Sequence, residues 1–387
     1  MDVLEFGLCE LQERISLCQR KINEHGMSGI VITGDQNITY YANFRSPCRW
    51  NTFTRPTFMF IPSQGIPVLY TQVMFTPVAK EKATFYKHKS FDSLLGPSIV
   101  ELTDIMDELN MTKGGIGFEL GHEQRLGIQV DMFLSLKQAL PDAEFLDASD
   151  IIWSQRLIKS ESEITCIRRA CQATSYAFNR LYENVKAGMT ERDITMMAQR
   201  YMIEGGAERP GFHIITAGEG GYDRICDTGR NRKLQEGDFL WLDMGAVYNG
   251  YWSDFCRSGV VGAISTQRNH LQNLVHEVTM EAAEMLHPGI NVKEIALACL
   301  DGMRKRGVEV KFECGRMGHG IGLNSTEPPS ITLNDDVILK EGMVIALEPG
   351  ISNDDGLYDI EEIFVVRKNG GECLTDSNRR LHIIPKI

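Results

Sequence analysis

The chain has 387 residues, which is enough for two or three domains at the usual ~100–200 residues per domain. Its composition, with 43% hydrophobic and 24% charged residues, excludes fibrous, collagen-like and wholly disordered proteins. The formal net charge of −12 repels phosphate backbones and anionic lipids, so we expect no nucleic acid partner.

The N-terminal segment and the cysteines indicate the compartment. The first residues, MDVLEFGLCELQER, are acidic and amphipathic, and they lack the basic and apolar regions of a secretion signal. No later apolar run approaches the ~20 residues that cross a bilayer, so we expect no membrane partner. Ten cysteines are scattered without a CxxC pair, which favours reduced thiols over disulfides or a zinc finger. We therefore expect a cytoplasmic protein.

The first 155 residues have the pattern of a small α/β domain. Strands and helices alternate in it, which is typical of that class. The predicted helices cover 8–26, 97–112 and 122–139, and the predicted strands cover 29–34, 57–61, 66–71 and 115–119. This half contains no motif with recognisable chemistry.

A second domain is predicted over residues 156–387. A long amphipathic helix over 161–185 marks its start, with Ser160 as the N-cap and Glu163 three residues later, the pattern of a capping box. Further helices, strand pairs and glycine-punctuated strands follow, and they favour an α+β domain with an antiparallel sheet.

The most informative segment contains Asn249-Gly250 between two alternating apolar runs, the strongest short signal for a β-hairpin. A two-residue turn pairs Tyr248 with Tyr251, and it makes Asp243 and Asp254 diagonal neighbours on one face. Carboxylates whose backbones are roughly 7–8 Å apart can reach a shared cation, whereas a buried pair without one would be costly. The hairpin therefore predicts a metal site, although two acids on an ordinary hairpin more often face solvent.

Three later segments supply further candidate ligands. His319 lies in the glycine-rich run GHGIG, Glu348 ends a strand-like run over 344–350, and Glu361 and Glu362 lie near the start of another apolar run. Each signal alone has an ordinary explanation as a core histidine or a solvated acid. Together with the aspartates, they form a set of oxygen donors and one imidazole that suits two divalent ions such as Mn²⁺, Co²⁺ or Zn²⁺.

These segments, in this order, resemble the signatures of the superfamily of creatinase, prolidase, aminopeptidase P and methionine aminopeptidase. The matching runs are LQEGD over 234–238, Asp243 to Asp254, GHGIG over 318–322, LEPG over 347–350 and IEE over 360–362. The helix start over 156–164 is similar to the linker helix of prolidases and creatinase. The resemblance implies an α+β chain with a creatinase-type N-terminal α/β domain over 1–155 and a pita-bread catalytic domain over 156–387. It also implies a homodimer.

The resemblance further assigns the ligands of two metal ions to Asp243, Asp254, His319, Glu348 and Glu361. We prefer Glu361 to Glu362, because the residues that follow it then run in step with the family pattern. In that family the ions bridge a water and lower its pKa, and the glutamate before Pro-Gly, here Glu348, is the catalytic proton shuttle. Creatinase has lost most of these ligands and works without metal, so the complete set implies a metal-dependent enzyme.

Proline-directed peptidases of the family carry two histidines near the scissile bond, and this sequence has neither. The second position is Thr326, which can form hydrogen bonds but carries no charge at neutral pH. The candidate substrate-binding residues are His213, Tyr222, Asp223, Arg224 and Thr326. Arg224 could hold a carboxylate bidentately. The ordinary alternatives are a surface loop for 222–224 and a satisfied core residue for His213.

The leading prediction for function is a dinuclear metal hydrolase of a C–N bond, similar to Xaa-Pro dipeptidases and aminopeptidase P, that acts on a short peptide or a peptide-like small molecule. The missing histidines leave open a non-peptidase member, which would act on a small solute as creatinase does or eliminate a sulfonium group. A third possibility is an inactive binding module, and the complete ligand set argues against it.

Overall fold

The computed structural model describes residues 6–45, 55–82, 85–222, 224–308 and 316–386. Within these residues the chain separates into two compact units, with the boundary between Arg156 and Leu157. Nowhere in the described ranges is a helix both long and apolar enough to cross a bilayer. Eight cysteines lie in these ranges and all are free thiols, whereas Cys48 and Cys314 fall outside them.

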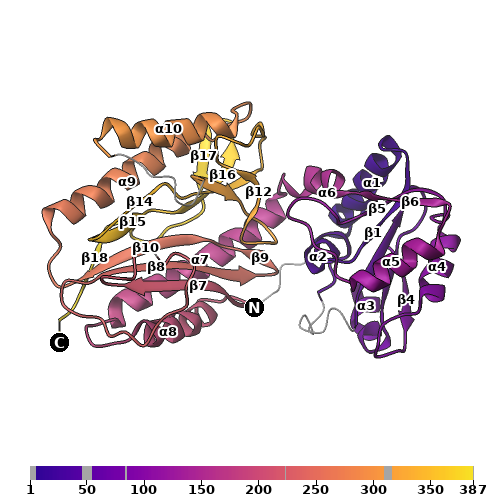
Figure 1. Cartoon of the computed structure of the whole chain (residues 1–387), viewed down its shortest axis with the longest axis horizontal. Helices are drawn as coiled ribbons and strands as arrows, with labels where there is room; N and C mark the ends of the chain where they lie inside the picture. The colour runs from indigo at the N-terminus through magenta and orange to yellow at the C-terminus, as the bar shows by residue number, and fades with distance from the viewer. Residues whose placement is uncertain (1–5, 46–54, 83–84, 223, 309–315, 387) are drawn as a thin grey trace. The chain divides into compact units, whose positions relative to one another are not determined.

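The first unit is an α/β domain built on a six-stranded mixed sheet (Figure 1). Its strands are β1 (Met27–Ile32), β2 (Phe58–Pro62), β3 (Val68–Gln72), β4 (Lys87–Phe91), β5 (Gly114–Phe118) and β6 (Ala143–Asp147), in the order β4-β3-β2-β1-β5-β6. Its helices are α1 (Leu8–Glu24), α2 (Asp35–Ala42), α3 (Thr76–Lys82), α4 (Ile99–Glu108), α5 (Val130–Ala139) and α6 (Ser149–Arg156), with a 3₁₀ turn η2 (Val73–Phe75).

One face of this sheet forms a hydrophobic core with α4 and α5. Met106 of α4 and Leu136 of α5 are buried in the same cluster as Phe60 of the sheet. The predicted helix over 122–139 is correct only from Val130 onward. The preceding turn is not helical, because Glu123 has a φ of +55°. The chain at Gly127 also passes close to Thr33, the residue after β1, and a Cβ at Gly127 would lie 2.0 Å from the carbonyl oxygen of Thr33.

The second unit contains four helices and twelve strands among the residues that the structure describes. The helices are α7 (Glu161–Asn184), α8 (Glu191–Glu204), α9 (Thr266–Glu284) and α10 (Val292–Lys305). The strands are β7 (Arg209–Ala217), β8 (Phe239–Tyr248), β9 (Tyr251–Trp252), β10 (Phe255–Val261), β11 (Gly318–Gly320), β12 (Glu327–Ser330), β13 (Val344–Leu347), β14 (Gly350–Asn353), β15 (Gly356–Asp359), β16 (Glu362–Arg367), β17 (Gly370–Cys373) and β18 (His382–Ile384).

These strands form two five-stranded sheets and one hairpin. The first sheet has the order β18-β10-β8-β7 with β9 paired to β8, the second has the order β12-β11-β13-β16-β17, and β14 pairs with β15. Helices α7 and α8 contact β8 and β7 from one side, while α9 and α10 lie on the other side of the strands (Figure 1). The hydrophobic core between the strands and α9 and α10 includes Trp241, Val275 and Ile345.

The capping box at the start of α7 is confirmed. The Ser160 hydroxyl accepts the backbone N–H of Glu163 at 3.2 Å, and the Glu163 carboxylate accepts the backbone N–H of Ser160 at 3.0 Å. These two bonds satisfy donors that a helix start otherwise leaves free, so α7 begins where the sequence indicates.

The predicted hairpin is also confirmed, with its register. Tyr248 pairs with Tyr251 across the turn, and the same register places Asp243 opposite Cys256. Both turn residues have positive φ, +51° at Asn249 and +86° at Gly250, as a two-residue hairpin turn requires. Asp254 lies in the short break between β9 and β10, on the strand that returns past Asp243.

Candidate active site

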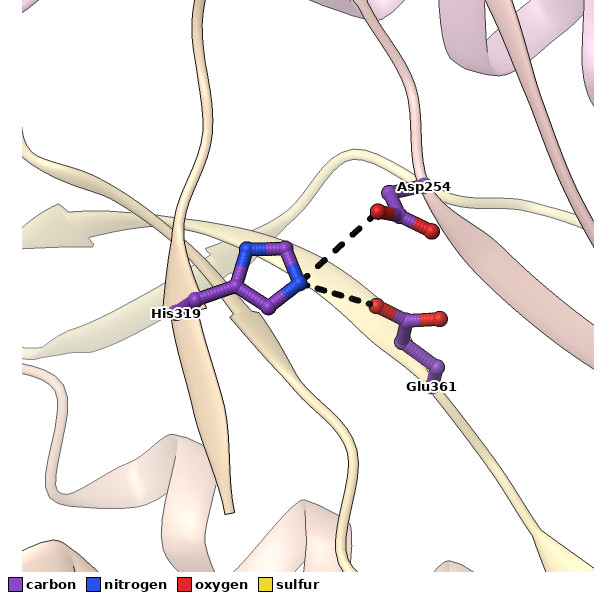
Figure 2. A group of neighbouring side chains, drawn as sticks. All are labelled: Asp254, His319 and Glu361. Atoms are coloured by element: carbon purple, nitrogen blue, oxygen red, sulfur yellow. Dashed lines mark ion pairs between the residues drawn. The ribbon is translucent and has the colours of Figure 1, made fainter. Parts of the chain in front are cut away.

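Strand ends from both sheets of the second unit bring three of the predicted ligands together. Asp254 directly precedes β10, His319 is the central residue of β11, and Glu361 directly precedes β16. One ligand atom from each of the three side chains lies within 4.8 Å of the other two. Figure 2 shows the His319 ring with one nitrogen directed at the carboxylates of Asp254 and Glu361.

The hydrogen bonds of His319 fix which ring nitrogen faces the acids. Nδ1 lies 2.9 Å from the carbonyl oxygen of Gly320, and a carbonyl only accepts, so Nδ1 carries the proton. Nε2 therefore presents its lone pair. It lies 3.7 Å from Oδ2 of Asp254, and also 3.7 Å from Oε1 of Glu348 and Oε1 of Glu361. Burial lowers the pKa of His319, which favours the neutral ring that a metal ligand needs.

The 3.7 Å separations leave room for a shared ion. They exceed the length of a hydrogen bond. Two donor atoms that are each about 2.1 Å from one ion are separated by up to ~4.2 Å, so a cation fits between these atoms.

Asp243 completes the acidic group from the neighbouring strand β8. Its Oδ1, like Oε1 of Glu361, is buried and has no hydrogen-bond partner among the described residues. Burial, and then the charge of Glu348, raises the pKa of Asp243 to about 8. Burial and the neighbouring carboxylates also raise the pKa values of Asp254 and Glu361 well above their ordinary range. Several buried carboxylates around one neutral imidazole are costly without cations, so the residues fit divalent metal ions.

Glu348 differs from the other acids in its exposure and its partner. It follows the end of β13, and its side chain is 25% exposed, compared with 8% for Asp254 and 3% for Glu361. Its Oε1 accepts a hydrogen bond from Nε of Arg316 at 3.1 Å. Nη2 of the same arginine lies 3.4 Å from the hydroxyl of Thr326. The structure thus places Thr326 beside the acids through Arg316.

The structure separates the two adjacent glutamates. Glu361 faces Asp254 and His319, whereas Glu362 is fully buried in another direction. Its Oε1 accepts hydrogen bonds from Arg257 at 2.8 Å and from Arg379 at 2.6 Å. Arg257 also donates to the backbone carbonyl of Glu361 at 3.1 Å. This buried pair therefore fixes the backbone from which the Glu361 side chain projects.

Sequence reasoning missed two residues at this site, Arg316 and Asp359. Asp359 is buried, its Oδ1 has no partner in the described ranges, and burial and the charge of Glu348 raise its pKa. Strand alternation could not have indicated it, because Asp359 ends β15 and Glu361 precedes β16, so no strand contains both residues. Alternation gave no signal for Arg316 either. It is three residues from His319, and alternation along one strand would put the two side chains on opposite faces of the sheet. It lies before β11 begins, so the rule does not apply to it.

The predicted substrate contact His213 does not lie with this group. His213 pairs with Met244 while its neighbour Ile214 pairs with Asp243, so His213 is on the other face of the sheet. There its Nε2 bonds the side-chain amide of Gln199 on α8 at 2.8 Å, while the residue is only partly buried and its Nδ1 has no partner among the described residues.

The 222–224 segment also departs from the prediction. Tyr222 lies in the hydrophobic core, its ring packs edge-on against Phe239, and its hydroxyl accepts the backbone N–H of Phe239 at 3.1 Å. Arg224 is exposed and pairs with Asp227 of its own loop. Arg224 agrees with the alternative of a surface loop, whereas Tyr222 belongs to the core and agrees with neither interpretation. Asp223 lies outside the described residues.

Comparisons with known proteins decide the family. Residues 165–368 match the model of metallopeptidase family M24, and residues 14–158 match that of the creatinase/prolidase N-terminal domain. The chain belongs to metallopeptidase family M24. The N-terminal creatinase-type domain and the pita-bread catalytic domain are thereby confirmed, and the protein is a metal-dependent hydrolase of the peptidase type.

Similar M24 proteins match over most of their length. The chain is 29% identical to a Xaa-Pro dipeptidase of Pyrococcus horikoshii over 96% of this chain and 99% of the relative. It is 31% identical to a Xaa-Pro dipeptidase of Lactobacillus helveticus over 67% of this chain and 71% of the relative. The solved Xaa-Pro dipeptidase from Bacillus anthracis is 26% identical, covers 97% of this chain and 99% of its own, and has a TM-score of 0.83. These relatives favour the peptidase over the solute-cleaving, lyase and binding-module alternatives.

Proposed function

We propose that this M24 protein is a Xaa-Pro dipeptidase that hydrolyses the amide bond before proline in short peptides. One observation carries the proposal: a neutral imidazole nitrogen faces three carboxylate oxygens at 3.7 Å in a buried site, with unpartnered acid oxygens around it. The relatives named above are Xaa-Pro dipeptidases that match across both domains, which supports the substrate class.

We assign the donors of two divalent ions, Mn²⁺, Co²⁺ or Zn²⁺, to Asp243, Asp254, His319, Glu348 and Glu361. When bound, such ions supply Lewis acidity, which lowers the pKa of a water molecule and polarises the scissile carbonyl. The fit rests on the chemistry of the donor set and on the buried oxygens of Asp243 and Glu361 that have no partner among the described residues.

The side chains of the chain itself have separate tasks in this proposal. His319 is held in one tautomer by the carbonyl of Gly320, so its lone pair always faces the acids. The side chain of Glu348 is more exposed than those of Asp254 and Glu361, so it is the one that can accept a proton from water and return it to the departing nitrogen. We also propose that two copies of the chain, each with domains over 1–155 and 156–387, form a homodimer, as the family resemblance implies. The scattered cysteines without a CxxC pair support a cytoplasmic protein.

The test is turnover of Xaa-Pro dipeptides by the full chain after loading with Mn²⁺, Co²⁺ or Zn²⁺, with proline release as the readout and metal content measured on the same samples. We expect activity that requires about two ions per chain. The metal-stripped protein and the Asp254→Asn variant serve as inactive references. Protein that holds two ions and cleaves no Xaa-Pro dipeptide with any of these metals would refute the proposed substrate class.

A further inference from the structure

Asp359 lies between two of the assigned metal donors. It ends β15 and pairs with Gly350 at the base of the β14–β15 hairpin. Glu348 is two residues before Gly350, and Glu361 is two residues after Asp359. The Asp359 carboxyl group packs over this base, because a Cβ at Gly350 would lie 3.5 Å from its carboxyl carbon. The hairpin thus places the carboxylate where the two chain segments that carry Glu348 and Glu361 meet.

Cys256 connects Asp359 with the other acids of the site. Cys256 lies opposite Asp243 in the pairing of β8 with β10, and its sulfur accepts the backbone N–H of Glu361 at 3.3 Å. After burial, the charge of Asp359 is the largest cause that raises the pKa of Cys256. Burial, and then the charges of Glu348 and Asp243, raise the pKa of Asp359 itself. The Asp359 carboxylate therefore lies among the acids of the site.

Asp359 has no positive partner within the described part of the chain. The residue is 8% exposed, and its Oδ1 has no hydrogen-bond partner among the described residues. Within the same ranges no lysine or arginine forms an ion pair with it, whereas the buried neighbour Glu362 pairs with both Arg257 and Arg379. A buried carboxylate among other acids is costly unless a cation compensates for its charge. A bound metal ion is the cation that fits this position.

We propose that Asp359 is a further donor of the metal centre, in addition to the five residues assigned above. The inference rests on the proposed function and names the ion that the site selects. With Asp359 included, the donors are five carboxylates and one imidazole. Such an oxygen-rich set favours Mn²⁺ over Zn²⁺, because Mn²⁺ suits carboxylates whereas Zn²⁺ suits imidazole and thiolate.

The competing explanation is that Asp359 is a protonated structural acid beside the thiol of Cys256. A neutral acid contributes no charge to a bound ion. Asn has nearly the same shape, so it would then replace Asp359 without loss of metal affinity. If Asp359 is a donor, the same replacement removes a charged ligand and weakens metal binding.

The experiment titrates the metal-free full chain, as wild type and as Asp359→Asn, with Mn²⁺ and separately with Zn²⁺ in a calorimeter. We expect the Kd for Mn²⁺ to rise about 10–100-fold in the variant, the loss typical of residues that support a metal site. The Kd for Zn²⁺ should rise less, because Zn²⁺ depends less on carboxylate donors. Asp354→Asn is the matched control: it removes an exposed acid from the same hairpin and should leave both Kd values within about 2-fold.

Thermal denaturation separates lost metal binding from lost folding. Without metal, Asp359→Asn should have a Tm equal to or above that of the wild type, because it removes a buried charge. The rise in Tm on addition of Mn²⁺ should be smaller in the variant than in the wild type. A lower Tm of the metal-free variant would identify a structural acid and overturn the inference.

Unchanged Mn²⁺ affinity in Asp359→Asn, or equal losses for Mn²⁺ and Zn²⁺, would also overturn it. Turnover of Xaa-Pro dipeptides is measured on the same samples, so the two proposals can fail separately. If Mn²⁺ affinity depends on Asp359 but no dipeptide is cleaved, the proposed function fails and the additional donor stands. If dipeptides are cleaved and Mn²⁺ affinity does not depend on Asp359, the additional donor fails and the proposed function stands.

Discussion

Nε2 of His319 lies 3.7 Å from Oδ2 of Asp254, although the two residues belong to different sheets. Asp254 is presented by the hairpin of the first sheet, and His319 by the central residue of β11 in the second. The site therefore exists only when both sheets pack together. Local motifs supply its residues, but tertiary packing supplies its geometry.

Replacement of Asp254 by Asn should abolish activity and leave the fold intact. The amide keeps the shape of the side chain but removes a metal donor, so we expect kcat to fall by roughly 10³-fold or more. In metal-free protein the change also removes a buried charge, so the free energy of unfolding should stay equal or rise. Activity, metal content and urea denaturation check this, with Asp227→Asn as an exposed control. A wild-type rate in Asp254→Asn would contradict the site.

Without metal, the free energy of unfolding should fall as pH rises. Burial raises the pKa of Asp243 to about 8 in the folded chain, and those of Asp254 and Glu361 are also raised. The folded state thus favours the protonated acids, and the unfolded chain loses these protons first, at about pH 4. The protonated acids therefore stabilise the folded chain fully below pH 4, and this contribution is lost as pH rises toward 8.

Calorimetric scans between pH 5.5 and 8 test this expectation. The Tm of EDTA-treated protein should fall with rising pH relative to Mn²⁺-loaded protein, because ions bind the ionised acids and compensate for their charge. The Asp254→Asn variant, stripped of metal, should show a smaller fall. If Tm changes with pH by the same amount with and without metal, the buried acidic site is contradicted.

Disruption of the buried ion pair between Lys159 and Glu327 should destabilise the second unit. Both side chains are almost fully buried, so Lys159→Met removes the ammonium that offsets the charge of the Glu327 carboxylate and should cost about 3–5 kcal/mol. The double variant with Glu327→Gln should recover most of this loss. Urea denaturation measures both, and equal stability of the two variants would argue against a pairwise interaction.

Loss of the capping box should weaken α7 modestly. Ser160→Ala removes the acceptor of the Glu163 N–H and should cost about 1 kcal/mol of unfolding free energy. The control is Ser16→Ala, an exposed serine within α1, which should stay within about 0.5 kcal/mol. If the two variants are equally stable, the cap does not contribute.

The site residues that could be predicted were those with a local cause. The Asn249-Gly250 turn sets the hairpin register without help from the rest of the chain, so the relation of Asp243 to Asp254 followed from sequence. The capping box at Ser160 is likewise complete within four residues. Glu361 was chosen over Glu362 by comparison with a family pattern, and the structure turns Glu361 toward His319.

The residues that could not be predicted depend on contacts distant in sequence. The face of His213 depends on how β7 aligns with β8, and a register shift between Pro210 and Phe212 alters that alignment. Arg316 reaches Glu348 from outside any strand, so no periodicity applies to it. Strand β4 has the sequence KHKSF, which lacks apolar alternation because it lies at the edge of its sheet.

The turn at Asn249-Gly250 has one more consequence, for protein engineering. Asn249 is buried, and the backbone N–H of Gly250 donates to Glu208 at 3.1 Å, so this turn is anchored, unlike most hairpin tips. One inserted residue would shift the returning strand by a step and rotate Asp254 to the wrong side of the sheet. Tags or reporter peptides placed here would inactivate the enzyme, although hairpin tips usually tolerate them.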